Sequence, residues 1–401
     1  MKILKPFLFC FSFFLFPTFT VAATYIVDKS GAGDFTTIQA AVSQAASAET
    51  MGPFRGFAYF TQGSDSVYIG SGLSSLQPAM LISVDDRNWY EIAEIIDSTH
   101  LRITRPYDGT NRFNSYKAVS IAIIKIKSGI YQESVNMQGL HFVRITGLGY
   151  TRESVIIQPL EVQDPMSEAT TGFYNIEDYG HVYFKKLTVR NITTGAIITT
   201  ANGGADNAPS DTNLTLENVH LDAQCCDVIL SPYGHVLIIS SRLEGENDVL
   251  GGFFKSLTVR RSDIMSHRNL AIFNAGKAVF VRLLYNSLIE DSLILTKAHD
   301  PANPASGNGT ALRVDSTNGS TLTIRNSVLL SEGGSGGIAL QLGNVTNDPP
   351  ASVLVEGSRL LARSRGASTD IQMRAIDSAT LKCTEYATVA GGGTPTTLSC
   401  P

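Results

Sequence analysis

A pattern of short apolar strands separated by a polar pair recurs along the chain from about residue 180 to about residue 360. Leu214–Leu221 and Leu322–Leu329 are two examples, in which alternating apolar residues stand on both sides of the polar pair. Such alternation is typical of β-strands, because successive side chains point to opposite faces. The polar corner returns after 23, 21, 30, 35 and 31 residues. Its positions are Asn218, Ser241, Ser262, Ser292, Ser327 and Ser358.

Unequal intervals between matching strands predict one coil per repeat, with loops of variable length between the coils. Helical solenoids need longer segments with a helical period, and the sequence shows none of these. A β-sandwich would need hairpin turns such as Asn-Gly between adjacent strands, and such turns are sparse here. We therefore predict an all-β chain whose main part is a right-handed, single-stranded parallel β-helix.

The beginning of the chain has the features of a secretory signal. Met1–Lys5 carries two positive charges, Pro6–Phe19 is mostly apolar, and Val21–Ala23 supplies small residues to a signal peptidase. We predict that residues 1–23 are a signal peptide cleaved near Ala23, and that the mature chain is secreted or periplasmic. No later apolar run has the length of a membrane span, so we do not expect the protein to span a membrane.

A change in composition at residues 50–120 divides the mature chain. Four short apolar segments with turns between them predict a small inserted antiparallel β module there, while 24–49 and 121–401 form the β-helix. Phe35–Ala45 has the pattern of a short amphipathic helix, which we expect to cover the open end of the β-helix. Trp89 lies in the insert. We expect it in the core of this module, and an exposed Trp that stacks on sugar is the alternative.

Charge and cysteine usage exclude several classes of protein. The chain has 31 basic and 36 acidic residues, and this net charge of −5 argues against nucleic-acid binding through a basic surface. The mature cysteines contain no CxxC motif, so we predict no metal and no cofactor. Cys383 and Cys400 could form a disulfide in an oxidising compartment. For Cys225 and Cys226 we expect buried thiols, with a strained vicinal disulfide as the alternative.

Three segments of the N-terminal part stand out as motifs. They are the strand and glycine-rich turn of Tyr25–Phe35, the GIYQE motif of Gly129–Glu133, and the VRITGLG segment of Val143–Gly149. In their order and sequence these segments resemble the N-terminal coils of pectin methylesterases. The resemblance implies a parallel β-helix and hydrolysis of the methyl esters of a polyuronate. It also implies an acidic, pectin-like polysaccharide as the partner, and we expect the chain to act as a monomer.

The resemblance also assigns candidate catalytic residues. The family uses two aspartates on neighbouring coils, and Asp227 and Asp248 lie 21 residues apart, about one coil. Arg313 is the positional match for the family's arginine, and Gln224 is the nearest candidate for its amide donor. The chain departs from the family pattern where Val314 and Asp315 replace Pro-Trp, so the aromatic residue that would contact sugar is missing there.

The implied mechanism uses one carboxylate as nucleophile and one carboxyl as acid and base. Asp248 would attack the ester carbonyl, with the cation of Arg313 beside it. Asp227 would protonate the departing methanol and then activate water, and Gln224 would donate to the oxyanion.

Three other interpretations stay open. An aspartate at a coil corner often accepts backbone hydrogen bonds and has no catalytic role. The chain could instead be a non-catalytic β-helix that binds polysaccharide or a surface partner, with the insert as its recognition module. A uronate lyase or epimerase that uses Ca²⁺ is the third interpretation, but its acidic candidates lack an ordered ligand spacing. They are Asp206, Asp211, Asp222 and Asp227.

Overall fold

The computed structural model describes most of the chain after the predicted signal segment. The described residues are 23–49, 55–85, 88–159, 172–177, 179–192, 198–200, 211–223, 228–230, 233–246, 248–268, 277–298, 308–332, 336–343, 349–363, 368–374 and 376–398. Every structural statement below concerns these residues. The predictions for Cys225, Cys226, Cys400, Asp227 and Gln224 fall outside them and stay predictions, although Cys383 is disulfide-bonded.

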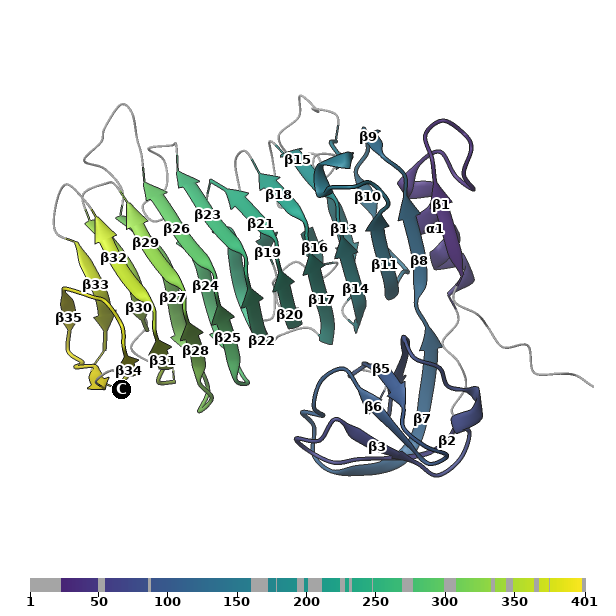
Figure 1. The fold of residues 1–401 in the computed structure, drawn as a ribbon, viewed down its shortest axis with the longest axis horizontal. Coiled ribbons are helices and arrows are strands. Elements are labelled where there is room, and N and C mark those ends of the chain that lie inside the picture. Colours follow the sequence, from purple (N-terminus) through teal and green to yellow (C-terminus); the bar gives the residue numbers. More distant parts are fainter. Residues whose placement is uncertain are drawn as a thin grey trace, which may run out of the picture.

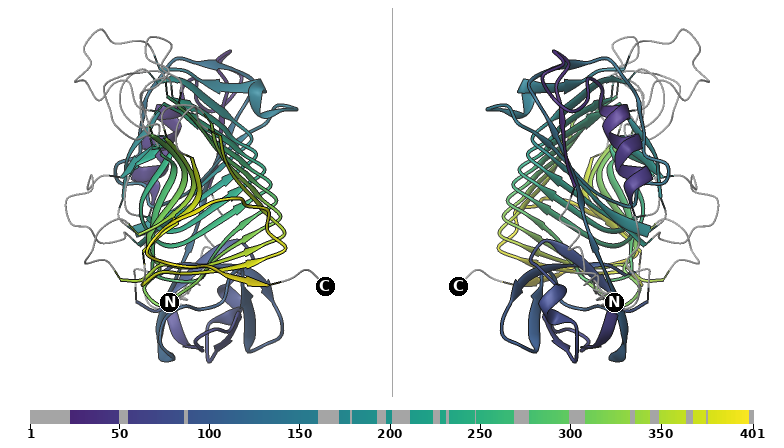
Figure 2. Two further views of the ribbon diagram at one scale, coloured as in Figure 1. Left: turned by 90° about the vertical axis from the view of Figure 1, so that its left-hand side faces the viewer. Right: turned by 90° about the vertical axis from the view of Figure 1, so that its right-hand side faces the viewer.

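Parallel strands stacked coil upon coil form the main body, which confirms the predicted fold class (Figure 1). Viewed along the long axis, the strands of successive coils lie behind one another (Figure 2). The first parallel sheet runs over two walls of the solenoid and contains β1 (Thr24–Val27), β8 (Ala122–Ile126), β10 (Val135–Asn136), β11 (Phe142–Gly147), β13 (Phe173–Ile176), β14 (Tyr179–Lys185), β16 (Ile198–Thr200), β17 (Asp211–Glu217), β19 (Ile229–Leu230), β20 (Tyr233–Ile239), β22 (Leu250–Arg260), β24 (Lys277–Leu283), β25 (Ser287–Glu290), β27 (Asn308–Ser316), β28 (Leu322–Arg325), β30 (Gly336–Leu342), β31 (Ser352–Glu356), β33 (Thr369–Met373), β34 (Ser378–Lys382), β35 (Val389–Gly391) and β36 (Thr396–Leu398). The remaining wall is a nine-stranded parallel sheet of β9 (Gly129–Tyr131), β12 (Val155–Ile157), β15 (Thr188–Ile192), β18 (His220–Ala223), β21 (Arg242–Gly245), β23 (Asp263–Arg268), β26 (Leu293–Ala298), β29 (Val328–Glu332) and β32 (Arg359–Arg363).

Inward side chains of successive coils stack in columns and form the core. One column is in register through ten coils, and its members are all buried. They are Ile124, Ile145, Phe184, Leu216, Ile238, Val259, Ile289, Ile324, Val355 and Leu381. Each coil therefore buries apolar area only against its neighbours, so the stability of the solenoid depends on contacts between adjacent coils.

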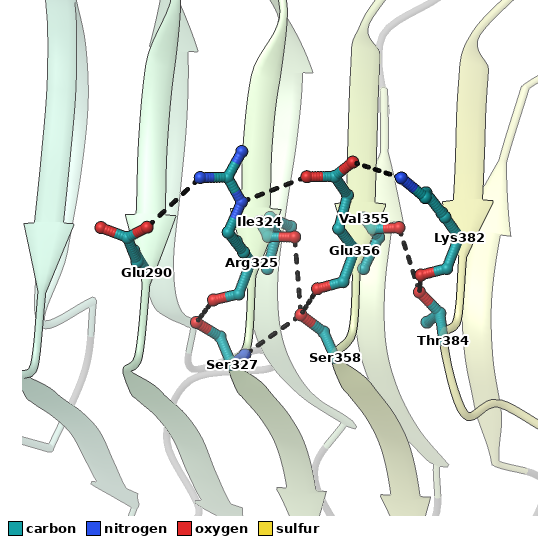
Figure 3. Close-up of polar contacts among 9 residues, drawn as sticks. All are labelled: Glu290, Ile324, Arg325, Ser327, Val355, Glu356, Ser358, Lys382 and Thr384. Carbon is teal, nitrogen blue, oxygen red and sulfur yellow. Dashed lines mark hydrogen bonds and ion pairs between the residues drawn. The ribbon is translucent and has the colours of Figure 1, made fainter. Parts of the chain in front are cut away.

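The five serines among the predicted polar corners form a ladder of hydroxyl groups between coils, whereas at Asn218 the contact is made by the next residue, because the backbone N–H of Val219 donates to the hydroxyl of Ser241 at 3.2 Å. The backbone N–H of Ser327 donates to the hydroxyl of Ser358 at 3.1 Å, and each of these hydroxyls donates to a carbonyl two residues earlier in its own coil (Figure 3). The same contact between coils links Ser241, Ser262, Ser292 and Ser327. The ladder satisfies backbone groups that are buried at the corner and cannot reach water.

The residue before each ladder position has a left-handed backbone. Ser240, Arg261, Asp291 and Asn326 have φ values of 50°, 49°, 50° and 48°, and Gly357 has 56°. Only this conformation turns the chain sharply from one sheet into the next, and asparagine, aspartate and glycine tolerate it better than most residues.

A row of alternating charges lies outside the corner, one charge per coil. Arg325 pairs with Glu290 at 3.4 Å and with Glu356 at 3.1 Å, and Lys382 pairs with Glu356 at 3.7 Å (Figure 3). These groups are half-exposed, so each pair contributes little by itself. Charges of opposite sign on adjacent coils still favour the observed register over a shifted one.

Helix α1 (Ile38–Ala48) covers the N-terminal end of the solenoid, as predicted from its apolar face. Its first two N–H groups, from Ile38 and Gln39, donate to the carboxylate of Glu133 at 2.8 and 2.9 Å. The hydroxyl of Tyr131 donates to the carbonyl of Lys127. The GIYQE motif thus has a structural role here, because its tyrosine and glutamate fix the first coil and the helix that covers it.

The inserted segment forms a closed antiparallel barrel (Figure 1). The four predicted apolar segments form the strands β3 (Ser66–Ile69), β4 (Met80–Ser83), β5 (Tyr90–Ile95) and β6 (His100–Ile103). Two further strands complete the barrel, and the sequence analysis did not predict them: β2 (Arg55–Phe60) and β7 (Arg112–Ser120). Two short 3₁₀ turns, Leu73–Ser75 and Arg152–Ser154, complete the described elements.

The barrel packs on the N-terminal coils through its buried tryptophan. Trp89 is fully buried, as expected, and its ring meets Phe142 of β11 edge-on at 4.7 Å. Glu91 of the barrel pairs with Arg144 of the solenoid at 3.0 Å, and Asp108 pairs with His235 at 2.6 Å. Burial lowers the pKa of His235 to about 4, so its contact with Asp108 joins a neutral ring to a carboxylate near neutral pH. The barrel is therefore fixed to the solenoid by an apolar contact with one ion pair and one histidine–carboxylate contact beside it.

Candidate active site

Of the four predicted site residues, Asp248 and Arg313 belong to the described part of the chain. Asp248 lies directly before β22, and Arg313 lies in β27. Both belong to the wall that contains β22, β24, β27, β30 and β33. Asp227 and Gln224 lie outside the described residues, so the predicted approach of the two aspartates remains a prediction.

Asp248 is held by Lys277 of the next coil. The backbone N–H of Lys277 donates to Oδ1 of Asp248 at 3.1 Å, and its Nζ lies 3.4 Å from Oδ2. The two side chains are only 19% and 16% exposed. Strand pairing explains the contact, because Leu250 is opposite Val279 and Asp248 is therefore opposite Lys277. A partly buried carboxylate with an ammonium group beside it is suited to act as an anion.

Arg313 has a different carboxylate partner. Its guanidinium donates to both oxygens of Asp315, at 2.7 and 3.1 Å, in the bidentate geometry that arginine favours. Asp315 is 1% exposed, and Arg282 lies 3.6 Å from it. Two cations thus compensate one buried anion, which is the condition under which a carboxylate is stable in the interior.

Register sets the distance between the two predicted residues. Arg313 is opposite Phe280, whereas Asp248 is opposite Lys277, three residues earlier on the same strand. Two strand spacings and three residues along the strand separate their Cα atoms by about 14 Å. Because Asp315 lies further along β27, its contact draws the guanidinium of Arg313 away from Asp248.

Aromatic rings lie between the charges of this wall. Two cations lie near the ring of Phe280. Nζ of Lys277 is 5.2 Å from the ring centroid, and the guanidinium carbon of Arg313 is 4.9 Å from it. The guanidinium of Arg282 lies over Phe253 at 4.6 Å. The coil that precedes Arg313 thus places an aromatic ring beside it, which the sequence analysis did not predict.

One outward row continues from these charges along the solenoid. Pairing places Phe280, Arg313, Gln341 and Gln372 side by side on successive coils, with buried neighbours on both sides of each. Cationic, aromatic and amide groups that follow one another at about 4.8 Å can contact successive units of a polymer lying along the axis. We call these four residues the outward row.

A second carboxyl lies close to Asp248 in the sequence. Glu246 is half-buried, and burial raises its pKa above the ordinary value for glutamate. A carboxyl with a raised pKa keeps its proton more readily near neutral pH, which is the requirement for a general acid. The sequence analysis did not single out Glu246, because no motif distinguishes it from other surface glutamates.

Glu244 on the adjoining wall has two histidine neighbours. The Nε2 atoms of His220 and His267 each lie 3.3 Å from its carboxylate, and burial lowers the pKa of both rings.

Within the described ranges, no group of three or more histidine, cysteine, aspartate or glutamate side chains is arranged to hold a metal ion. No described helix is long and apolar enough to cross a membrane.

The chain has partial likeness to several solved structures. No protein-family model matches the chain, and no curated protein matches it either. A pectin methylesterase from carrot is 14% identical, with 88% of this chain and 84% of that chain covered and a TM-score of 0.34. Pectin methylesterase PemA from Erwinia chrysanthemi is 12% identical, over 68% and 72% of the two chains, with a TM-score of 0.26. The A-module of the mannuronan C-5 epimerase AlgE6 from Azotobacter vinelandii is 15% identical, over 70% and 91%, with a TM-score of 0.30.

At these identities the likeness carries no information about substrate or catalytic residues. The class of the protein rests on the strand pairing itself, which defines a parallel β-helix with a small inserted barrel.

Proposed function

We propose that the chain is a secreted or periplasmic ester hydrolase that removes methyl groups from a polyuronate, with Asp248 as the nucleophile. The observation that carries the proposal is the pair of Asp248 and Lys277, which is four-fifths buried on the wall that also bears the outward row. A nucleophilic carboxylate needs a fixed position and a neighbouring cation, and this pair supplies both.

In the proposed reaction, a carboxylate oxygen of Asp248 attacks the ester carbonyl carbon. The bond from carbon to the methoxy oxygen then breaks, and the leaving oxygen takes a proton from a carboxylic acid to form methanol. Water, deprotonated by the resulting carboxylate, attacks the acyl-enzyme and releases Asp248. Asp227 is the acid and base that we propose from the sequence, and Glu246 is the second candidate because its pKa is raised.

The outward row supports an acidic substrate. Arg313 places a cation on this row beside its partner Asp315, and Phe280 presents a ring next to it. Gln341 and Gln372 add amide groups that bond hydroxyl and carboxylate oxygens. Because the row lies along the coils, we propose that the polymer binds along the solenoid axis.

Methanol release from methyl-esterified pectin tests the proposal. We expect release by the wild type and a loss of at least a hundredfold for Asp248→Asn, which keeps the shape of the side chain but removes its charge. Asp291→Asn is the matched control, because Asp291 lies at a coil corner with a left-handed backbone that asparagine tolerates. Parallel assays of Asp227→Asn and Glu246→Gln assign the acid, and no release by the wild type from any esterified polyuronate would refute the proposal.

A second function is favoured by one contact. Arg313 is engaged with Asp315, whereas the resemblance assigns it to the nucleophile. A non-catalytic protein that binds acidic polysaccharide needs the outward row but no nucleophile. Retention on immobilised polygalacturonate, unchanged in Asp248→Asn and with no methanol release, would support this function in place of the hydrolase.

A further inference from the structure

Four aromatic side chains lie exposed on one face of the inserted barrel. The exposed fractions of Phe57, Tyr59, Tyr68 and Phe113 are 52%, 39%, 41% and 62%. They belong to β2, β3 and β7, whereas the contacts with the solenoid come from Trp89, Glu91 and the loop before β7. We call these four residues the aromatic stripe.

Strand pairing arranges the stripe in a line. Tyr59 of β2 is opposite Phe113 of β7 on one side and opposite Tyr68 of β3 on the other. Adjacent strands are about 4.8 Å apart, so the stripe extends about 10 Å across the barrel, and His100 of β6, which is opposite Tyr68, lies one strand further on. Phe57 stacks on Phe113 with ring centroids 5.5 Å apart and planes only 12° from parallel.

The barrel does not need these rings for its own core. Residues that alternate with them, such as Ala58 and Phe60, are fully buried and belong to the barrel core. Exposed rings cost free energy in water, and scattered single cases are ordinary, but four on one face point to an occupant.

The size of the stripe distinguishes among occupants. An aromatic side chain presents roughly 200 Å², so these exposed fractions amount to about 400 Å² together. A stable protein interface needs about 800 Å² from each partner. The stripe is thus too small and too narrow for a second copy of the chain, and it fits a thin, extended ligand.

Charges around the stripe are already paired. Arg102 pairs with Glu94 at 2.6 Å and with Asp65 at 3.7 Å, and His100 lies 3.2 Å from Asp97. From β2 to β7 the insert has six basic and seven acidic residues. This face offers no excess of positive charge to a polyanion, so its complement is a neutral molecule.

We propose that the aromatic stripe binds a neutral linear polysaccharide, whose apolar sugar faces stack on the four rings while its hydroxyls bond the Tyr59 and Tyr68 phenols. Linear polysaccharides repeat a flat apolar face along their length, which matches a line of rings at strand spacing. The barrel then tethers the solenoid to a neutral glycan. This inference does not depend on the proposed hydrolase, because it uses other residues and another ligand.

Affinity electrophoresis of the mature chain tests the proposal. Native gels contain either a soluble neutral β-glucan, a galactomannan or polygalacturonate. We expect a neutral glycan to retard the wild type, and we expect the double variant Phe57→Ala and Phe113→Ala to bind it roughly tenfold more weakly or worse. Tyr59→Phe and Tyr68→Phe, which keep the rings, should lose less affinity than the alanine variants of these two tyrosines.

Tyr150→Ala is the matched control, because Tyr150 is fully exposed but lies on the solenoid. It should bind like the wild type, and equal melting temperatures of all variants establish that the barrel still folds. Retardation by polygalacturonate alone, by none of the three polymers, or to the same extent in the double variant would overturn the proposal. Self-association of the wild type that the double variant abolishes would also overturn it, in favour of a second copy.

Discussion

Replacing Ser292 by alanine tests the ladder that joins the coils. The hydroxyl of Ser292 accepts the backbone N–H of Ser262 at 3.2 Å and donates to the carbonyl of Glu290 at 2.7 Å. Ser262 is 2% exposed, so its N–H cannot bond water once the acceptor is removed. An unsatisfied buried donor costs about 1–3 kcal/mol, and the loss of the second hydrogen bond adds about 1 kcal/mol. The alanine variant no longer has to remove a polar hydroxyl from water, and this gain offsets part of the cost. We therefore expect the free energy of unfolding to fall by about 2 kcal/mol.

Urea titration followed by circular dichroism measures this change, with Ser378→Ala as the control. Ser378 is exposed at the start of β34 on the same solenoid, so its replacement should change stability by less than about 0.5 kcal/mol. In Ser292→Ala we also expect faster hydrogen exchange at the Ser262 amide, because coils are stabilised by their nearest neighbours. Equal stabilities of the two variants, with unchanged exchange at Ser262, would refute the view that the ladder stabilises the stack.

Three further outcomes follow from the described contacts. Asp291→Gly should raise the free energy of unfolding by about 0.5–1 kcal/mol, because glycine adopts the φ of 50° without strain; a lower melting temperature would contradict this. Glu133→Gln should lower stability by about 1 kcal/mol, because a neutral amide accepts the N–H groups of Ile38 and Gln39 less strongly; thermal melts measure the loss, and an unchanged melting temperature would argue against the cap. Burial, with the nearby arginines, lowers the pKa of His181 to about 4, below its ordinary value of 6.5. The neutral ring is therefore favoured in the folded state, so its stability contribution is complete above pH 6.5 and is lost as the pH falls towards 4. Denaturation of the wild type and His181→Asn across this window should show a flatter profile in the variant, by about 3 kcal/mol at most.

The periodic features of the fold could be predicted because their signals are local. Alternation and the polar corners follow directly from which side chains face the core, and Ser241 to Ser358 form the ladder that their spacing indicated. The barrel was harder, because β2 and β7 lack a strict alternation. Arg55–Phe60 begins with polar and glycine residues, and Arg112–Ser120 is mostly exposed at its start. Closure of the barrel, rather than local pattern, makes these segments strands.

The site was less predictable because its contacts cross between coils. Asp248 was predicted as a site residue from its spacing of 21 residues to Asp227, but its partner in the structure, Lys277, lies 29 residues further on. Because the loops differ in length, the sequence does not show which residues become neighbours on adjacent coils. The contact between Asp248 and Lys277 follows from the pairing of Leu250 with Val279. Sequence spacing alone therefore cannot assign a partner to a charged residue in a solenoid with irregular coils.

Register also explains which cation lies beside Asp248. A cation beside Asp248 has to come from the position opposite it on the adjacent coil, which Lys277 occupies. Arg313 is one coil further along and has Asp315 two residues away on the same face, so the closer carboxylate holds it. If Lys277 has taken the charge role that the resemblance gives to Arg313, Lys277→Gln should reduce methanol release far more than Arg313→Gln does. In that case Arg313→Gln should mainly raise KM, because it would weaken the binding of the acidic polymer. The opposite ranking of the two variants would mean that the guanidinium leaves Asp315 when substrate binds.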